Sequence, residues 1–437
     1  MKRLLVTGAS GFLGSRITDY YRGKYEIYAP SHRELDIAWG GELSCRIMAW
    51  SPDFIVHCAA VSDVGRCERE PELSWKINVE GSINIAEAAR KAGAKCLICS
   101  SDQVYFGSHL RGPHSEEEAL SPCNLYGKQK LWAEEECLRV NPECVLLRLS
   151  WMYDIRTMNR GEHGDFFRTL LAKINSSEAL RFPVHDVRGI TDVNEVVRNL
   201  ERAFGLEGGI YNFGSPNEKN TYGTMTEIFE KLQWDTAPLE PDQAAFLDNP
   251  RDMSMSQEKI NEKGIFFSRT ADALAEHLSQ ASQSRPQIRG IDSDTDKKTI
   301  ARTILEALPD WFGIPEATEQ YIADSSGKVF LCAYDGEKPV GFLYLKETGR
   351  HTVELAVMGV LKEYHRLGIG RKLFEAARER AEGQGYSFIQ VKTVQMGRYD
   401  SYDDTNRFYL SLGFKELEVF PTLWDECNPC QIYIMSV

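Results

Sequence analysis

The sequence has little that would suit a membrane protein or a binder of acidic polymers. No run of about 18 apolar residues occurs, so no membrane span is expected. Basic residues are outnumbered, with 51 lysines and arginines against 64 aspartates and glutamates, and the net charge is −13. This charge argues against nucleic acids and acidic membranes as partners. Small-molecule substrates are therefore the expected partners.

Cysteine is present in an odd number, 11, and its spacing does not predict a metal site. Cys96 and Cys99 fall on an apolar run that reads as a strand, where residues three apart face opposite sides. Cys427 and Cys430 enclose Asn-Pro and are compatible with a redox turn, but no second ligand pair lies near them. We expect reduced thiols in a cytoplasmic protein, and no metal.

A cleavable signal peptide is not predicted, because Gly8 and Gly11 interrupt the only apolar stretch at the start. Met1 is instead expected to begin a buried strand. The 437 residues exceed what one hydrophobic core usually accommodates, so two or three domains are expected.

Short apolar runs alternate with helical patterns over the first 150 residues, which predicts an α/β Rossmann-type doubly wound parallel sheet. The runs cover 2–7, 25–30, 53–58, 95–100 and 144–149, with helices expected at 72–92 and 127–140. After residue 150 the pattern is mixed and predicts a small substrate subdomain. Helices are expected there near 164–176, 192–204 and 222–233.

A polar stretch then separates two regions of different rhythm. We predict a first domain at 1–280, a linker at 281–287 and a second domain at 288–437. The second domain has helical patterns at 295–324, strands over 328–360, a long helix at 369–382 and further strands after it. This order predicts an α+β domain with a mixed sheet.

A glycine-rich turn follows the first apolar run and precedes a helical pattern. Glycine permits the tight turn and the close approach of a pyrophosphate, and the free N–H groups of the helix start can hold that group. The expected dinucleotide-binding residues are Gly8, Ser10, Gly11, Phe12, Leu13 and Gly14.

A tyrosine and a lysine four residues apart, Tyr126 and Lys130, are expected on one face of a helix. A nearby ammonium is expected to lower the pKa of the phenol, which otherwise lies near 10. Ser101 follows a predicted strand and can hydrogen-bond a substrate carbonyl. The three residues predict a site where tyrosine protonates a carbonyl oxygen as hydride arrives from a nicotinamide.

Residues 1 to about 280 resemble the extended short-chain dehydrogenase/reductases, and most of all the dTDP-4-dehydrorhamnose reductase family. The segments that carry the resemblance are TGASGFLG, ELDI (34–37), HCAA (57–60), SSDQVY (100–105), LYGKQK (125–130), RLSWMYD (148–154) and PRDMSM (250–255). The resemblance implies that Ser101, Tyr126 and Lys130 are catalytic. It also implies that Asp36 contacts adenine and that Ala59 and Ala60 lie beside the nicotinamide.

The family reduces a 4-keto nucleotide sugar, whereas the similar β subunits of methionine adenosyltransferase serve as a binding module. One departure concerns the family's DQxGxPT run, which reads Asp186-Val187-Arg188-Gly189-Ile190-Thr191-Asp192 here. The identity of the sugar therefore stays open.

The expected end of the second strand carries Ser31 and Arg33, which suit a 2′-phosphate better than a ribose hydroxyl. Glu34 lies at about the spacing of the acidic residue that binds a ribose hydroxyl. NADP(H) is favoured, and NAD is the alternative.

A second glycine turn precedes the long helix expected at 369–382, and a segment N-x-x-F-Y-x-x-L-G-F follows at 406–414. Over about 288–437 the chain resembles the GNAT acetyltransferase superfamily, although His365 replaces the usual glutamine or arginine. The resemblance implies acetyl-CoA as co-substrate. The residues expected to bind it are Val360, His365, Arg366, Leu367, Gly368, Ile369, Gly370, Arg371 and Asn406.

In the same domain Tyr409 is expected to protonate the leaving thiolate, and Glu354 is the candidate base for the attacking amine. The sequence thus predicts a bifunctional enzyme that reduces a keto group and acetylates an amine. In the alternative, the first domain is a non-catalytic dinucleotide-binding module attached to an active acetyltransferase. A homo-oligomer is compatible with either hypothesis.

Overall fold

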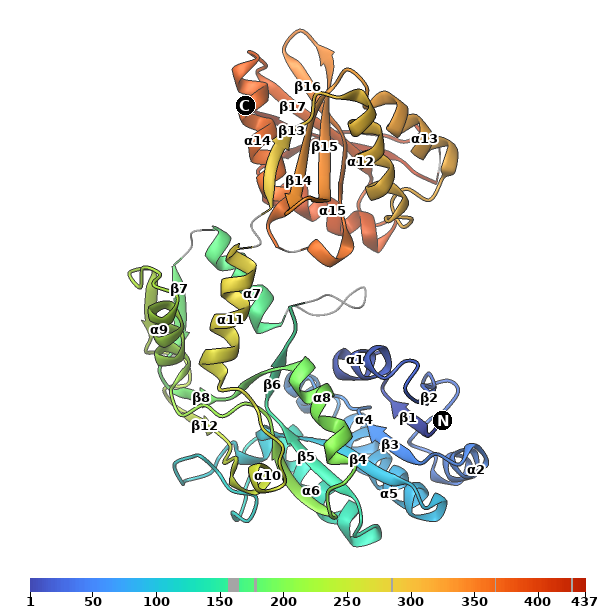
Figure 1. Ribbon diagram of the computed structural model, residues 1–437, viewed down its shortest axis with the longest axis vertical. Helices are drawn as coiled ribbons and strands as arrows, with labels where there is room; N and C mark the ends of the chain where they lie inside the picture. Colours follow the sequence, from blue (N-terminus) through green and yellow to red (C-terminus); the bar gives the residue numbers. More distant parts are fainter. Residues whose placement is uncertain (156–164, 177–178, 284–285, 366, 426) are drawn as a thin grey trace. The chain divides into compact units, whose positions relative to one another are not determined.

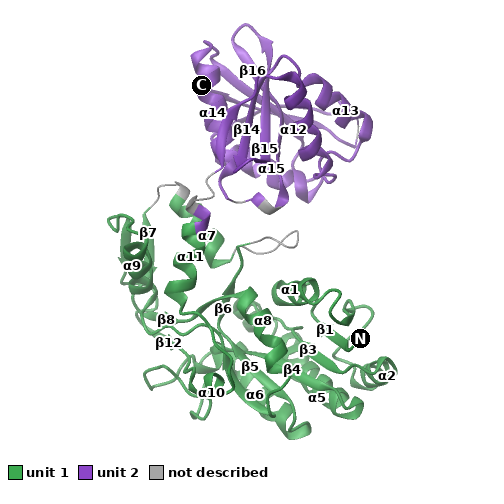
Figure 2. Cartoon of the chain, in the orientation of Figure 1, with its two compact units in different colours: residues 1–279 green, residues 280–437 purple. Residues whose placement is uncertain are grey.

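The computed structural model describes the chain except for residues 156–164, 177–178, 284–285, 366 and 426. The chain forms two compact units, residues 1–279 and 280–437, which Figure 2 distinguishes by colour. Each unit has its own hydrophobic core.

The first unit is built on a parallel sheet with the strand order β10-β5-β4-β3-β1-β2 (Figure 1). Leu4 and Val6 of β1 pack with α1 (Phe12–Tyr20) and α8 (Val193–Ala203), whereas Leu5 between them packs with α2 (Gly40–Trp50) and α5 (Gly81–Ala92) on the opposite face. The sheet is therefore doubly wound, as the sequence predicts. The strands are β1 Arg3–Thr7, β2 Glu26–Tyr28, β3 Phe54–His57, β4 Lys95–Ser101, β5 Val145–Leu149 and β10 Gly209–Phe213.

One helix and one strand of this sheet depart from the sequence prediction. The helix expected over 72–92 consists of α4 (Pro71–Trp75), a π-helical turn and α5. Strand β10 was not predicted. The helices around the sheet are α1 Phe12–Tyr20, α2 Gly40–Trp50, α3 Val64–Arg69, α5 Gly81–Ala92, α6 Leu125–Val140 and α8 Val193–Ala203, with the π-helical turn at Lys76–Glu80 and a 3₁₀ turn at Asp102–Tyr105.

Short strands beyond β5 pair two by two, as β6 with β9, β7 with β11 and β8 with β12. This smaller region comprises β6 Trp151–Tyr153, α7 Phe166–Ser176, β7 Leu180–Pro183, β8 Asp186–Arg188, β9 Ile190–Asp192, α9 Thr221–Lys231, β11 Leu239–Asp242, β12 Arg251–Met253, α10 Glu258–Glu262 and α11 Thr270–Gln283. Helix α11 continues to Gln283 and β13 starts at Gln287, so both ends of the segment predicted as a linker, 281–287, are in regular structure.

The second unit has a mixed sheet with the order β13-β14-β15-β16-β17-β19-β18. Its strands are β13 Gln287–Gly290, β14 Val329–Asp335, β15 Lys338–Gly349, β16 Thr352–Val360, β17 Phe388–Val394, β18 Lys415–Phe420 and β19 Cys430–Ser436. Helix α14 (Ile369–Gly383) packs on one face, and α12 (Asp294–Glu306) packs on the other. Two further helices are α13 Pro315–Asp324 and α15 Asp400–Ser411.

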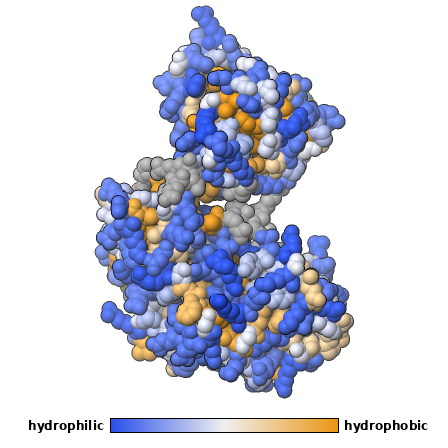
Figure 3. Space-filling model, viewed as in Figure 1, coloured by the Kyte–Doolittle hydropathy of each residue, from blue (hydrophilic) through white to orange (hydrophobic). Residues whose placement is uncertain are grey.

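No helix within the described part of the chain is both long and apolar enough to cross a membrane. The face of the molecule seen in Figure 3 is mostly hydrophilic, with smaller hydrophobic areas between the polar ones. This surface agrees with the charged fraction of 26%.

Candidate functional sites

The glycine turn of the first unit leaves no room for side chains at two of its positions. Gly8 has φ +67°, and a Cβ there would lie 2.6 Å from the amide nitrogen of Ala59. A Cβ on Gly14 would lie 2.3 Å from the carbonyl oxygen of Gly8. The turn closes with a 3.0 Å hydrogen bond from the Gly11 amide to the Gly8 carbonyl. Backbone therefore packs on backbone, which brings the start of α1 against β1.

Helix α1 begins after Gly11, which offers no side chain as a cap. Its first amides can therefore bind an anion. Phe12 is half-buried, with the Arg16 guanidinium 4.1 Å from its ring centre, whereas the Leu13 side chain is buried in the core. Arg16 itself forms a buried ion pair of 2.8 Å with Asp154. Ser10 is exposed at the turn.

The three residues expected to be catalytic come from two elements of the first unit. Ser101 ends β4, and Tyr126 and Lys130 lie one turn apart at the start of α6, where Asn124 caps the helix. All three side chains are buried. The Lys130 ammonium donates a 2.8 Å hydrogen bond to the Cys99 carbonyl and lies 5.7 Å from the centre of the Tyr126 ring.

The expectation that Lys130 lowers the pKa of Tyr126 is wrong for this arrangement. Burial raises the pKa of Tyr126 well above 10, and the carboxylate of Asp102 raises it further, whereas a hydrogen bond with Ser101 lowers it. Lys130 points to a backbone carbonyl, and burial lowers the pKa of its own ammonium. Binding of a ligand would have to change these contacts before the tyrosine ionises near neutral pH.

Asp102, next to Ser101, connects this site to the smaller region. Its carboxylate accepts a hydrogen bond from the Ser101 hydroxyl at 3.2 Å and forms a 2.9 Å ion pair with Arg188 of β8. Arg188 also stacks 5.0 Å from the ring centre of Trp151. Burial raises the pKa of Asp102, and Arg188 opposes that rise. Arg188 belongs to the segment that departs from the family pattern.

The residues after β2 include the groups that bear on the choice between NADP(H) and NAD. The Glu34 carboxylate accepts hydrogen bonds of 2.8 Å from the amide and the hydroxyl of Ser31. Arg33 is exposed, and Asp36 accepts a 2.9 Å hydrogen bond from the amide of Ala38. Ser31 is thus engaged by Glu34 and would have to exchange this partner for a phosphate.

Two neighbouring strands of the second unit diverge. β16 and β17 pair in parallel only from Thr352 opposite Phe388 to Leu355 opposite Val391. Beyond that point β16 continues to pair with β15 through Val360, and β17 pairs with β19. A β-bulge between β15 and β16 falls where the strands separate. Within the described residues, the part of β16 beyond Leu355 is therefore not paired with β17.

The glycine turn of this unit follows the divergent end of β16. Gly368, with φ +77°, precedes α14 and provides no side-chain cap. A Cβ on Gly370 would meet the Phe408 ring at 3.0 Å. His365 donates a 2.7 Å hydrogen bond from Nε2 to the Val360 carbonyl, so its side chain connects the turn to the end of β16.

The remaining residues expected at this turn divide between core and surface. Ile369 is buried, and Leu367 packs against the core. Arg371 donates a 3.1 Å hydrogen bond to the Ser411 carbonyl on α15. Arg366 lies outside the described residues. The side chains of Leu367 and Ile369 therefore support the turn, and ligand contacts there would come from the backbone.

Asn406, which the resemblance assigns to the pantetheine arm, makes its side-chain hydrogen bonds within the protein. It is fully buried, and its amide donates to the carbonyls of Val394 and Tyr402 at 2.9 and 2.6 Å. Its side-chain oxygen accepts a 2.7 Å hydrogen bond from Tyr433. With both donor hydrogens and one acceptor position of its side chain used within the protein, Asn406 holds α15 on the sheet.

Tyr409 and Glu354, the two residues expected to move protons, are in different settings. Tyr409 is buried against Phe414, and burial raises the pKa of its phenol, which keeps it protonated. Glu354 of β16 is nearly buried and forms a 2.8 Å ion pair with Lys392 of β17. The carboxylate would have to leave Lys392 to reach an attacking amine.

Several buried polar groups next to the first site were not predicted. Glu134 forms a 2.7 Å ion pair with Arg148 and accepts a hydrogen bond from Ser100. It lies four residues after Lys130, so helical spacing could have indicated it. His57 contacts Thr7 and Ser82 at 2.7 and 3.2 Å. No local pattern reveals this contact, because the three residues are far apart in the sequence.

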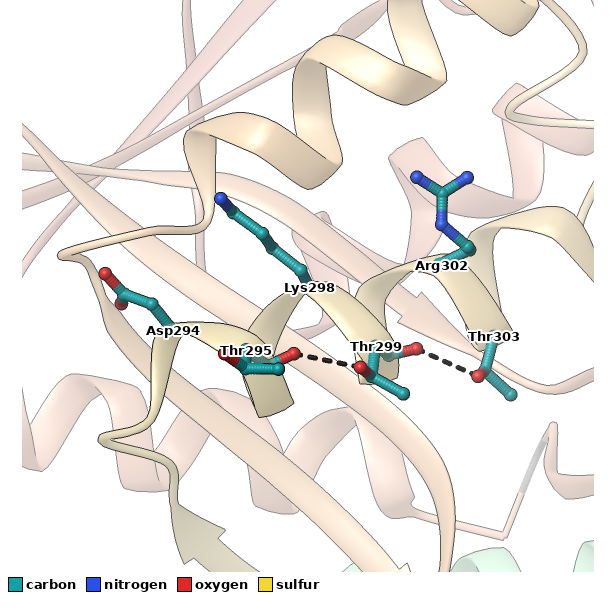
Figure 4. Close-up of a pocket in the computed structure, with 6 residues that line it drawn as sticks. All are labelled: Asp294, Thr295, Lys298, Thr299, Arg302 and Thr303. Carbon is teal, nitrogen blue, oxygen red and sulfur yellow. Dashed lines mark hydrogen bonds between the residues drawn. The ribbon is translucent and has the colours of Figure 1, made fainter.

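A shallow surface depression runs along α12 (Figure 4). Its lining belongs to one exposed helix face, where Thr299 and Thr303 donate hydrogen bonds of 2.9 Å to carbonyls one turn earlier. Arg302 is paired with Glu319 and Glu306. None of the residues expected at either site lines this depression.

The doubly wound sheet with a glycine turn at α1 is the architecture of Rossmann-type enzymes. Residues 1–283 match the RmlD substrate binding domain family, and the chain belongs to that family. Residues 326–416 match the acetyltransferase (GNAT) domain family. Both family matches made from the sequence motifs are confirmed, and both families are enzymes.

Individual relatives align with the first unit. The spore coat polysaccharide biosynthesis protein SpsK of Bacillus subtilis is 27% identical over 290 residues, 65% of this chain and 99% of that protein. The dTDP-4-dehydrorhamnose reductase of Streptomyces griseus is 30% identical over 257 residues, 57% of this chain and 82% of the reductase. A solved dTDP-4-dehydrorhamnose reductase of Bacillus anthracis in complex with NADP has a TM-score of 0.55 and 22% identity, and covers 64% of this chain and 99% of its own. This match shows that the first unit shares the fold of that structure.

Proposed function

We propose that residues 1–280 form one domain, and that this domain is an NADP(H)-dependent reductase acting on a keto group of a nucleotide sugar. The observation that carries the proposal is the burial of Ser101, Tyr126 and Lys130 at the end of β4 and the start of α6. A hydroxyl, a phenol and an ammonium of this kind suit proton transfer to a carbonyl oxygen.

Gly8, Gly11 and Gly14, with the first amides of α1, would hold the pyrophosphate of the dinucleotide, because a Cβ would fill the cradle at two of these positions. Bound NADPH would supply the hydride for the carbonyl carbon. Ser101 would hydrogen-bond the carbonyl oxygen, and Tyr126 would give it a proton. Lys130 would reprotonate the phenol through its own ammonium or a water, after release from Cys99.

NADP(H) is proposed over NAD for two reasons. Arg33 at the end of β2 is exposed and can meet a 2′-phosphate, and a Bacillus anthracis reductase with the same fold was solved with NADP. The Glu34 carboxylate on Ser31 opposes this preference and would have to move. Asp36, Ala59 and Ala60 complete the proposed dinucleotide site.

We also propose that the second unit transfers acetyl from acetyl-CoA to an amine. The gap between β16 and β17, followed by the turn at Gly368, offers amides for both the thioester oxygen and the pyrophosphate. Glu354 would take the ammonium proton, the amine would attack the thioester carbon, and Tyr409 would protonate the departing thiolate. The amine thus becomes an amide and coenzyme A leaves as the thiol.

A second hypothesis for the first unit is a non-catalytic dinucleotide-binding module. Two contacts favour it: the Lys130 ammonium is bonded to the Cys99 carbonyl, and Asp102 and burial both raise the pKa of Tyr126. A phenol that resists ionisation is a slow participant in proton exchange. Experiment can therefore distinguish a reductase from a dinucleotide-binding module.

The direct test is NADPH oxidation with a dTDP-linked 4-keto-6-deoxy sugar, comparing the full chain with Tyr126→Phe. Turnover that the variant lacks supports the reductase. Equal rates in both chains contradict it, and NADPH binding without turnover supports the module. Release of coenzyme A in the presence of a panel of amines, including amino sugars, tests the second unit in the same preparation.

We also propose that the protein works in the cytoplasm on small molecules. All eleven cysteines are free thiols, which fits the cytoplasm. The acidic net charge fits small-molecule partners better than nucleic acid or membrane. A homo-oligomer is compatible with the hypothesis, and size-exclusion chromatography with light scattering measures it.

A further inference from the structure

Two cysteines of the first unit lie in contact where the glycine turn, the sheet and Lys130 meet. The Sγ atoms of Cys58 and Cys99 are 3.7 Å apart, and both thiols are free. Cys58 follows the last residue of β3, and Cys99 lies on the neighbouring parallel strand β4. His57 pairs with Ile98, so the two cysteines occupy the next step of the same register.

We propose that Cys58 and Cys99 form a reversible disulfide with hydrogen peroxide, and that this bond weakens dinucleotide binding by the first unit. The second part of the proposal rests on the proposed reductase function. The first part concerns the thiols alone.

The geometry allows the bond with a small local movement. A disulfide requires the sulfurs to approach to about 2.05 Å, so the pair must close by roughly 1.6 Å. Cys99 is held within β4, whereas Cys58 lies beyond the end of β3 and is anchored by its amide to the Thr7 carbonyl at 3.2 Å. The movement therefore falls on Cys58 and Ala59.

The surroundings favour reaction of these thiols over inert packing. Cys58 is half-buried and Cys99 is buried. The hydrogen bond between the two thiols and burial raise the pKa of Cys58. The same hydrogen bond lowers the pKa of Cys99, which burial opposes, and the Lys130 ammonium acts to lower the pKa of both. Cys99 is therefore the thiol that ionises first. A nearby cation and partial exposure are the setting in which cysteines become reactive.

The chemistry balances without any further reactant. One thiolate attacks a peroxide oxygen, which gives a sulfenic acid and releases hydroxide. The second thiol attacks the sulfenic sulfur, forms the S–S bond and expels hydroxide, which leaves as water after taking up a proton. In total two thiols and one hydrogen peroxide give one disulfide and two waters, and a dithiol reductant reverses the reaction.

The consequence for the ligand follows from two neighbours. Ala59 already lies where a Cβ on Gly8 would clash, so a shift of Cys58 and Ala59 disturbs the dinucleotide turn. The Cys99 carbonyl holds the Lys130 ammonium at 2.8 Å, so a change at Cys99 also displaces this side chain. We expect NADPH affinity to fall at least about tenfold on oxidation, and bound NADPH to slow the oxidation.

The experiment treats the full chain with a small excess of hydrogen peroxide and blocks the remaining thiols by alkylation. Peptide mass spectrometry is then expected to find one linked pair, Cys58 with Cys99, that dithiothreitol removes. Absence of this linked peptide, while exposed thiols such as Cys45 are oxidised, overturns the disulfide. This readout does not depend on any activity of the chain.

NADPH and acetyl-CoA binding are measured on the same samples, with circular dichroism as a check of folding. We expect peroxide to weaken NADPH binding in the natural chain and in Cys45→Ala, but not in Cys58→Ala or Cys99→Ala, while acetyl-CoA binding stays unchanged. Loss of NADPH binding that persists in both alanine variants overturns the link to the ligand. If the reduced chain does not bind NADPH, the reductase proposal fails, and the linked peptide alone decides the disulfide.

Discussion

The two units place the same feature, an uncapped helix start after a glycine turn, in different surroundings. A Cβ on Gly14 in the first unit would lie 2.3 Å from a backbone carbonyl, whereas a Cβ on Gly370 in the second would meet the end of the Phe408 ring at 3.0 Å. The first cradle is backbone against backbone, and the second is closed by side chains that can rotate. The two turns can therefore bind the same chemical group although they differ in how well they tolerate an added methyl group.

The acid groups differ between the units in a related way. Tyr126 is close to a carboxylate, an ion pair and two thiols, whereas Tyr409 is packed among aromatic rings. Burial raises the pKa of both phenols. A raised pKa suits proton donation, the role proposed for both residues, but only at Tyr126 does a carboxylate, that of Asp102, add to the rise.

The largest expected effect is the loss of acetyl transfer when Tyr409 is replaced. Tyr409→Phe should lower kcat for acetyl transfer by about 10²- to 10⁴-fold, because the thiolate loses its proton donor. Coenzyme A release in the presence of an active amine measures it. Tyr126→Phe is the matched control and should leave acetyl transfer unchanged. Full activity of Tyr409→Phe would assign this tyrosine to packing alone.

Next in size is the response of the two glycine turns to one methyl group. Gly14→Ala should weaken NADPH binding about a hundredfold, since overpacking against backbone costs up to about 3 kcal/mol. Gly370→Ala should weaken acetyl-CoA binding by less than about tenfold, because Phe408 can move. Isothermal titration measures both, with Gly41→Ala as a control that meets nothing within 4 Å. A reversed order of the two effects would contradict the comparison.

The local pattern of the sequence predicted these turns and most strands, but it could not predict what surrounds them. β10 was missed because it follows Gly208, begins with Gly209 and has Asn212 within its short apolar run. The Asp102–Arg188 and Arg16–Asp154 ion pairs join residues that only the folded sheet brings together. The effect of Lys130 on Tyr126 was predicted wrongly because helical spacing gives a face but not the partner of an ammonium.

A smaller effect is expected on the stability of the first unit as the pH changes. Burial and the charge of Lys130 lower the pKa of His57 to about 3, from an ordinary value of 6.5. A depressed pKa means that the stability is present above pH 6.5 and is lost as the pH falls towards 3. The first unit should lose about 2 kcal/mol between pH 6.5 and pH 5.

Chemical denaturation at several pH values, followed by a probe in the first unit, measures this loss. His57→Gln should remove most of the dependence while keeping a donor and an acceptor for Thr7 and Ser82. An unchanged pH dependence in this variant would show that another group causes the loss.

The smallest effect concerns the choice between the two dinucleotides. Arg33→Ala should lower the preference for NADPH over NADH by about tenfold, the value of one charge-assisted hydrogen bond. Dissociation constants for both dinucleotides measure it, and acetyl-CoA affinity is the internal control. A variant that binds both dinucleotides as the natural chain does would place the 2′-phosphate elsewhere.

The central claim is that each unit holds one diphosphate on the bare amides of its own glycine turn. Titrating the full chain with NADPH and acetyl-CoA, alone and together, tests it most directly. The account predicts one site for each ligand, with Gly14→Ala weakening only NADPH binding. Failure to bind either ligand at millimolar concentration, or loss of acetyl-CoA binding in Gly14→Ala, would contradict it.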